Sequence, residues 1–143
     1  MNKSLTLDQR ISIVRYRMES AESTLAEVET HRTNGFYNTA VNRIYYACYY
    51  AATAILIANG IEVKSHDGVR MNLGKHIVQT GILSPKLGRY FSRLFTKRST
   101  GDYDDFFNPN RSLGPILFSN IKILGCSPQS QECLSLVHCS HKT

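Results

Sequence analysis

Apolar residues recur at three- and four-residue steps along the first part of the chain, which is the spacing of one face of an α-helix. Over residues 7–31 these positions are Leu7, Ile11, Val14, Met18, Ala21, Leu25 and Val28. Thr6 and Gln9 have the spacing of a capping box at the start of this segment. The pattern therefore predicts an amphipathic first helix over 7–31, which Asn34 and Gly35 then interrupt.

The second periodic segment, about 37–59, is apolar on nearly every side from Ile44 onward. A helix of this kind is stable in water only when other helices surround it, so we expect it to be the central and most buried helix. Gly60 follows as a C-terminal cap. The run from Ile44 to Ala58 is shorter than the about 20 apolar residues of a membrane-spanning helix, and no membrane association is predicted.

Two further helices are predicted over 65–80 and 85–98. The first contains Gly68 and Gly74, each of which lowers helix propensity by about 1 kcal/mol relative to Ala. The second begins at Ser84 and Pro85, where the serine caps the helix and the proline takes the first helical position. We expect strands in none of these segments.

The positive charge of the chain is concentrated on the last of these helices. The sequence has 17 Lys and Arg against 11 Asp and Glu, a net charge of +6, which permits a polyanionic partner. Between Ser84 and Arg98 there is no acidic residue. Basic residues there recur at three- and four-residue steps beside an apolar stripe, and these candidate polyanion-binding residues are Lys86, Arg89, Arg93 and Lys97.

The segment 108–143 differs from the rest of the chain. It is punctuated by Gly and Pro, contains Glu132 as its one acidic residue, and has no amphipathic period. It is interpreted either as a native, loop-rich tail with short helical pieces or as a frame-shifted or recombined end. We therefore place one domain at 1–107 and an atypical tail at 108–143.

Cysteine and histidine spacing gives no sign of a metal site. Cys48 lies in the apolar run and is expected to be a buried thiol. The remaining candidates match no zinc template, and they are Cys133, His138, Cys139 and His141. No cofactor and no metal are predicted, and the absence of an apolar signal core at the N-terminus indicates a cytoplasmic protein.

Four strings in the sequence together resemble a known domain. They are Ala40-Val41-Asn42-Arg43-Ile44-Tyr45-Tyr46-Ala47-Cys48-Tyr49-Tyr50-Ala51-Ala52, Ser65-His66-Asp67-Gly68, Gly81-Ile82-Leu83 and Arg98-Ser99-Thr100-Gly101-Asp102-Tyr103-Asp104. In this order, over about residues 7–107, they resemble the HEPN domain (higher eukaryotes and prokaryotes nucleotide-binding), in particular its small stand-alone prokaryotic members.

The resemblance implies an all-α fold, an up-and-down bundle of four to five helices that usually forms a homodimer. Many HEPN proteins look like ribonuclease toxins or RNA-binding modules, often encoded beside a small nucleotidyltransferase that neutralises them. Their signature is an Arg and a later His with four to six residues between them. The Arg can hold the scissile phosphate and the His can move the 2′-hydroxyl proton, so that no metal is needed.

This sequence departs from the signature after Arg98. The matching window holds Tyr103, Asp104 and Asp105 in place of a His. The resemblance leaves Arg98, Asp102 and Tyr103 as the candidate catalytic residues, although a Tyr hydroxyl with a pKa near 10 is a poor base at neutral pH. The alternatives are a site that binds RNA without cutting it, and an ion pair between Arg98 and Asp102 that ends the helix.

Three functional hypotheses follow. The first is a toxin-like protein of a toxin–antitoxin pair with a nucleotidyltransferase, acting on RNA as a metal-independent ribonuclease. The second is a non-catalytic helical adaptor that dimerises or binds the nucleotidyltransferase, and the third is nucleotide binding between the second and fourth helices. We interpret the tyrosines at 45, 46, 49 and 50 as core packing. His66, beside a helix start, is a candidate polar site residue, but we interpret it as a capping or solvated residue.

Overall fold

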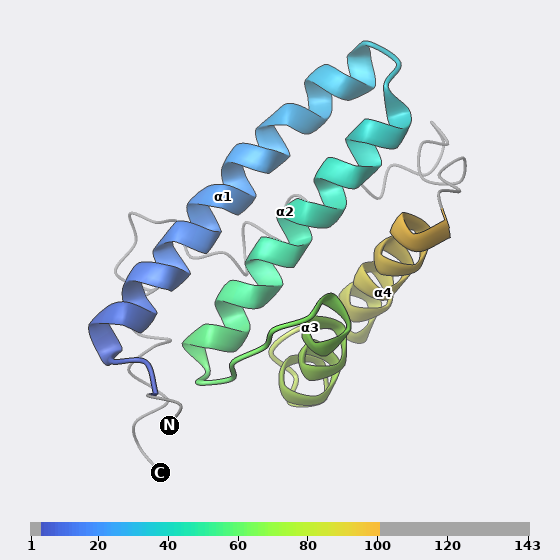
Figure 1. Ribbon diagram of the computed structural model, residues 1–143. Helices are drawn as coiled ribbons and strands as arrows, with labels where there is room; N and C mark the ends of the chain where they lie inside the picture. Colours follow the sequence, from blue (N-terminus) through green and yellow to red (C-terminus); the bar gives the residue numbers. More distant parts are fainter. Residues whose placement is uncertain (1–3, 101–143) are drawn as a thin grey trace.

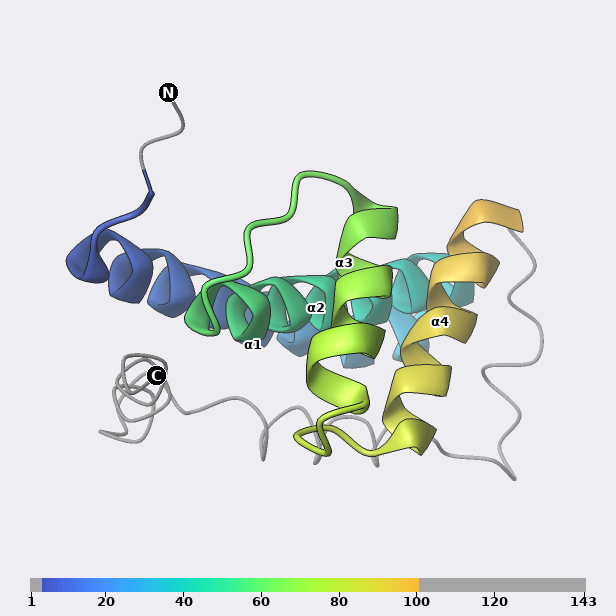
Figure 2. The same cartoon turned by 90° about the horizontal axis from the view of Figure 1, so that it is seen from below.

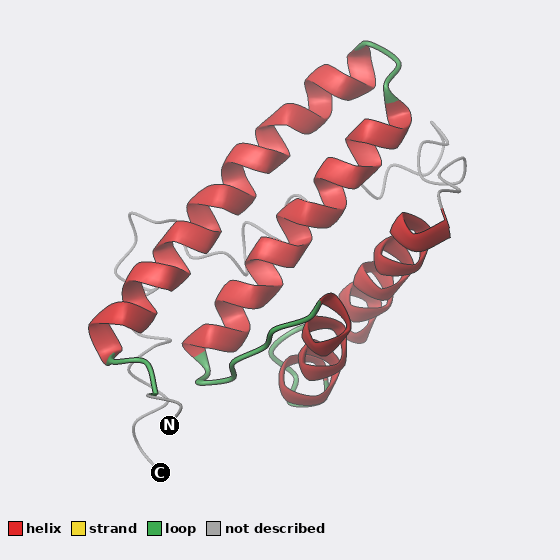
Figure 3. Cartoon of the chain, viewed as in Figure 1, coloured by secondary structure: helices red, strands yellow, loops and turns green. Residues whose placement is uncertain are grey.

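The computed structural model describes residues 4–100, with the side chains of 98–100 outside the description. All regular structure in this part of the chain is helical (Figure 3). The elements are α1 (Leu7–Thr33), α2 (Tyr37–Ala58), α3 (His66–Leu73), the π-helical turn η1 (Gly74–Val78) and α4 (Pro85–Thr100). The predicted all-α fold is confirmed, and the tail at 108–143 lies outside the described residues.

The helices form two antiparallel pairs, α1 with α2 and α3 with α4, and the second pair packs against α2. Helices α1 and α2 lie side by side as a long hairpin (Figure 1). Helices α3 and α4 form a shorter pair on the other side of α2, and Figure 2 shows that this pair crosses α2 steeply. No helix within residues 4–100 is long and apolar enough to cross a membrane.

The predicted start and end signals of α1 are present. The Gln9 backbone N–H donates to Thr6 Oγ1 at 3.2 Å, and the Thr6 N–H donates to Gln9 Oε1 at 3.0 Å. The helix continues to Thr33, two residues past the predicted end. Gly35 then adopts a φ of +77°, a left-handed conformation that favours glycine, and this turn reverses the chain into α2.

Helix α2 is the central helix, as its sequence predicts, because it contributes to both hydrophobic cores. Small side chains on one face pack against α1, and they are Ala51, Ala54 and Ala58. Larger side chains on the opposite face pack against α3, η1 and α4, and they include Ile44, Tyr45 and Leu56. Burial on both faces explains why α2 has no continuous polar stripe.

The third predicted helix is divided. Ser65 is the N-cap, since the Gly68 N–H donates to its Oγ at 2.9 Å, so α3 begins at His66. After Leu73 the chain widens into η1, where the Gln79 N–H donates to the carbonyl of Gly74 at 3.0 Å. A π-turn accommodates an extra residue, and it keeps Ile77 in the same core as Leu73.

Helix α4 begins at Pro85 as predicted. Ser84 caps it, because the Leu87 N–H donates to the Ser84 Oγ at 3.4 Å. The helix extends to Thr100, two residues beyond the predicted end. Its core face carries Tyr90, Phe91 and Leu94, all of which are buried.

Two glycines give a matched test of how η1 and α4 pack. A Cβ on Gly88 would lie 2.8 Å from Val78 Cγ2, whereas a Cβ on Gly74 would meet nothing within 4 Å. We expect Gly88→Ala to lower the free energy of unfolding by about 1–3 kcal/mol through overpacking. Gly74→Ala should raise it by up to about 1 kcal/mol by restricting the unfolded chain.

Urea denaturation measures both effects. In the Val78→Ala background, Gly88→Ala should cost clearly less than it does alone, because the clashing methyl group is gone. Equal effects of Gly88→Ala in the two backgrounds would contradict the close approach of α4 to η1.

Candidate functional site

An imidazole lies on a cluster of tyrosines where α3 meets α2. His66 Nδ1 is 2.8 Å from the Tyr45 hydroxyl oxygen. The His66 ring also stacks on Tyr49, with centroids 4.2 Å apart and planes inclined by 20°, and it meets the Tyr46 ring edge-on at 6.1 Å. These contacts fix the position and the orientation of a half-buried His66.

The interpretation of His66 as a capping or solvated residue is wrong. Ser65 provides the cap, and the first turn of α3 directs the His66 ring onto α2. The partner Tyr45 is 21 residues away in the sequence, so no local pattern indicates the contact. By contrast, the tyrosines pack as predicted, since Tyr45 is fully buried and the other three are partly buried against the two cores.

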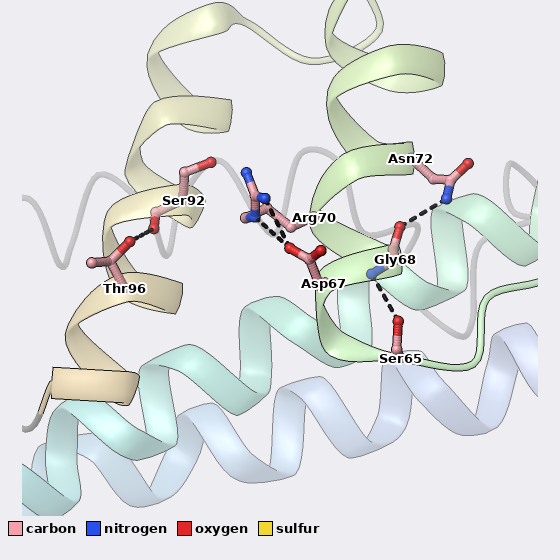
Figure 4. Close-up of polar contacts among 7 residues, drawn as sticks. All are labelled: Ser65, Asp67, Gly68, Arg70, Asn72, Ser92 and Thr96. Atoms are coloured by element: carbon pink, nitrogen blue, oxygen red, sulfur yellow. Dashed lines mark hydrogen bonds and ion pairs between the residues drawn. The ribbon is translucent and has the colours of Figure 1, made fainter.

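Arg70 lies one turn further along α3 and reaches toward α4. Its Nη2 is 2.8 Å from Asp67 Oδ1, and its Nε donates to the same oxygen at 3.1 Å. The guanidinium carbon lies 5.5 Å from the centroid of the Phe95 ring on α4. Figure 4 shows Arg70 and Asp67 in the space between α3 and α4, on the side of α4 that carries Ser92 and Thr96.

Sequence reasoning also missed Arg70. The three-residue spacing of Asp67 and Arg70 is a recognisable helical ion-pair pattern. The position of the guanidinium over Phe95 depends on the packing of two helices, which the spacing does not contain. Arg70 keeps 38% of its side chain exposed, so the cation is accessible from solvent.

The predicted basic residues lie along α4. Lys86, Arg89 and Arg93 are exposed, and Lys97 is half-buried. The structure therefore places three of the four cations on the outside of a helix whose opposite face is in the core.

The candidate catalytic residues fall at the end of the described chain. Arg98 lies on the last turn of α4, three residues after Phe95, and its side chain lies outside the description. Asp102 and Tyr103 lie beyond the described residues. Their grouping with Arg98 stays a prediction.

Two buried groups are neutral and do not belong to this site. Burial raises the pKa of the Cys48 thiol and of the Tyr90 hydroxyl above their ordinary values. Cys48 is buried, as predicted, and its neutral thiol is a weak nucleophile.

Within residues 4–100, no group of three or more His, Cys, Asp or Glu could hold a metal ion. The candidates between 133 and 141 lie outside the described residues.

The family model of the HEPN domain matches residues 14–139 of the chain. The protein belongs to the HEPN domain family. This confirms the resemblance identified from the sequence, and the matched range also includes most of the segment from 108 to 143. The boundary placed at 107 stays a prediction.

Relatives of this HEPN protein include small proteins whose names describe a family or a toxin. A UPF0332 protein of Thermotoga maritima is 33% identical over 99 residues, which are 69% of this chain and 75% of the relative. "Putative toxin MJ0142" of Methanocaldococcus jannaschii is 36% identical over 87 residues, 61% of this chain and 59% of the relative. "Putative toxin MJ0605" of the same organism is 31% identical over 86 residues, which are 60% of this chain and 64% of the relative.

The contact between Tyr45 and His66 has a measurable effect on stability. Tyr45→Phe keeps the buried ring and removes the hydroxyl, so it should lower the free energy of unfolding by about 1 kcal/mol. Tyr16→Phe is the matched control, since Tyr16 is 66% exposed, and it should change stability by less than about 0.5 kcal/mol. In a double-mutant cycle measured by urea denaturation, Tyr45→Phe and His66→Ala should be non-additive. Strict additivity would show that the two side chains do not interact.

Proposed function

We propose that this HEPN protein is a toxin-like protein that is paired with a small nucleotidyltransferase. It cleaves RNA in a site where Arg98 holds the scissile phosphate. The supporting observation is the basic face of α4, defined as Lys86, Arg89 and Arg93, which is exposed along a helix that leads to Arg98. Two relatives bear the name "Putative toxin", which agrees with a harmful activity. We extend the proposal to a cytoplasmic homodimer, as the family implies.

The basic face suits a nucleic acid better than an acidic protein surface. Its cations recur on one side of a helix, and residues 84–98 contain no acidic residue to compete with phosphate. Lys and Arg in such a row neutralise phosphates and release bound counterions, and this gives binding with little dependence on sequence. Arg70 adds a partly exposed guanidinium in the space between α3 and α4.

Arg98 is the proposed phosphate-holding residue of the reaction. A guanidinium presents two parallel N–H groups that match two phosphate oxygens, and it stays charged at every physiological pH. Asp102 and Tyr103 are proposed as its polar neighbours, in the positions that follow the signature Arg. The reaction proposed needs no metal, because charge stabilisation comes from arginine and proton transfer from a side chain.

The second candidate function is a non-catalytic adaptor that dimerises or binds a nucleotidyltransferase. The observation that favours it is the absence of His from positions 103–105, where the signature requires one. In that case the basic face would bind RNA or the partner without any reaction. Substitution at Arg98 separates this function from the first.

The contribution of the basic face can be measured by RNA binding. Lys86→Ala, Arg89→Ala and Arg93→Ala together should weaken binding to single-stranded RNA and lower the slope of log K against log salt by about 2, since three phosphate contacts are lost. The matched control removes three exposed cations elsewhere, at Arg15, Arg32 and Lys64. Fluorescence anisotropy at several salt concentrations measures both triple variants. Equal losses in both would show that net charge, and not the basic face, binds RNA.

The two candidate functions differ in the effect of Arg98→Lys. If Arg98 grips phosphate, the variant should lose at least about tenfold in RNA cleavage, because an ammonium group cannot replace the bidentate fork. An ion pair with Asp102 that only ends the helix is worth about 0–1 kcal/mol, and its replacement should leave growth and melting nearly unchanged. Tyr103→Phe tests the neighbouring hydroxyl in the same way.

RNA integrity and growth after expression, together with thermal melting, decide between these outcomes. A wild-type chain that neither degrades RNA nor slows growth in the absence of its partner would contradict the ribonuclease and support the adaptor. A chain that ends near Phe107 should be assayed in parallel as a control for the tail.

A further inference from the structure

Within the proposed ribonuclease function, on which this inference rests, we propose that His66 supplies the proton transfer that the signature assigns to a later histidine. The imidazole comes from the start of α3 and not from the positions after Arg98. Tyr45 acts as its positioning residue. The missing histidine is thus replaced by one that is 32 positions earlier than Arg98 in the sequence, on a helix that packs against α4.

Two contacts fix the orientation of the His66 ring, as is typical of a histidine that acts as a base. Its Nδ1 lies 2.8 Å from the hydroxyl oxygen of Tyr45, whose side chain is fully buried, so this edge of the imidazole is fixed against the interior. Stacking on Tyr49 at 4.2 Å fixes the plane of the ring. The second nitrogen, Nε2, lies on the opposite edge of the imidazole and points away from Tyr45. A base whose orientation is set by a third group is the arrangement that catalytic sites use.

The contact with Tyr45 is open to both neutral tautomers of His66, and the proposal requires the tautomer that carries its proton on Nδ1. When Nδ1 carries the ring proton, it donates to the Tyr45 oxygen, and the lone pair of Nε2 can accept a proton. Among the described residues, the titratable side chains of Tyr46 and Tyr49 from α2 contact the ring, and Asp67 follows His66 directly on α3. Asp67 forms an ion pair with Arg70, one turn further along α3.

The aromatic cluster around His66 also contacts α4, the helix that carries Arg98. The Tyr45 ring lies 6.0 Å from the Phe91 ring and 6.3 Å from the Phe95 ring, both on α4. Phe95 in turn lies under the guanidinium of Arg70, and Arg98 follows Phe95 by three residues on the same helix. Helices α3 and α4 therefore bring an oriented imidazole, a partly exposed guanidinium and the position of the signature arginine to one side of α2.

The proposed step is an attack of the ribose 2′-oxygen on the adjacent phosphorus. Nε2 of His66 takes the 2′-hydroxyl proton as the bond between O2′ and phosphorus forms, and the bond between phosphorus and O5′ breaks. The products are a 2′,3′-cyclic phosphate and a 5′-hydroxyl group, whose proton comes from water. The imidazolium then returns its proton to solvent, so the residue is unchanged after the reaction.

The test is single-turnover cleavage of an RNA oligonucleotide across pH 5–9, with RNA binding and thermal melting measured on the same proteins. We expect His66→Gln to cut RNA at least about 100-fold more slowly while it binds RNA as the wild type does. Because a protonated imidazole cannot act as a base, the wild-type rate should fall toward acid pH, and His66→Gln should lack this acid limb. The matched control His76→Gln changes the histidine of η1 and should cut RNA at the wild-type rate.

Tyr45→Phe and an added base give independent readouts. Tyr45→Phe should lower the rate and shift the acid limb without a change in RNA affinity, because it releases Nδ1 and leaves the ring packed. Cleavage by His66→Ala should recover in part when free imidazole is added, which a purely structural role would not produce. If His66→Ala does not fold, His66→Gln decides, because Gln can still bond to the Tyr45 hydroxyl.

The outcomes separate this inference from the function on which it rests. Wild-type rates in both His66→Gln and Tyr45→Phe would overturn the role of His66 and leave the ribonuclease in place. A wild-type chain that binds RNA and never cuts it would overturn both.

Discussion

The fold depends on how α2 distributes its side chains by size. The alanines at 51, 54 and 58 face α1 and allow the two long helices to lie close together. The larger residues, among them Tyr45 and Leu56, face the crossing pair of α3 and α4. Because neither face is polar, α2 is stable only while both sides are covered, and the positions of the other helices follow from that requirement.

The burial of Tyr45 requires a hydrogen-bond partner for its hydroxyl group. Tyr45 contributes its ring to the core, and a hydroxyl group taken out of water needs a hydrogen-bond partner. His66 meets this requirement at 2.8 Å, which fixes the first residue of α3. Gly68 allows the Ser65 cap to form close by, since a Cβ at that position would lie 2.9 Å from the Ser65 Oγ. The geometry of the candidate site is thus a consequence of core packing.

Local chemistry made most of the fold predictable from the sequence. The capping box at Thr6 and the pair Ser84–Pro85 act within one helical turn, and the helices begin where these signals indicate. The basic face of α4 was predictable for the same reason, because helical spacing alone separates it from the apolar face. The π-turn after Leu73 was not, since it depends on the packing of Ile77 against other helices. The contact of His66 with Tyr45 and that of Arg70 with Phe95 each join different helices, and no periodicity encodes such pairs.

The dependence of the site on the core has a further consequence for α3. Its eight residues are too few to be stable as an isolated helix. Its position comes from Val69 and Leu73 in the core and from the contact of His66 with Tyr45. The basic face of α4, by contrast, is set by a longer helix, and its exposed cations make no comparable demand on the core. The basic face and the oriented imidazole are therefore built on parts of the molecule with different local stability, so each can be altered separately.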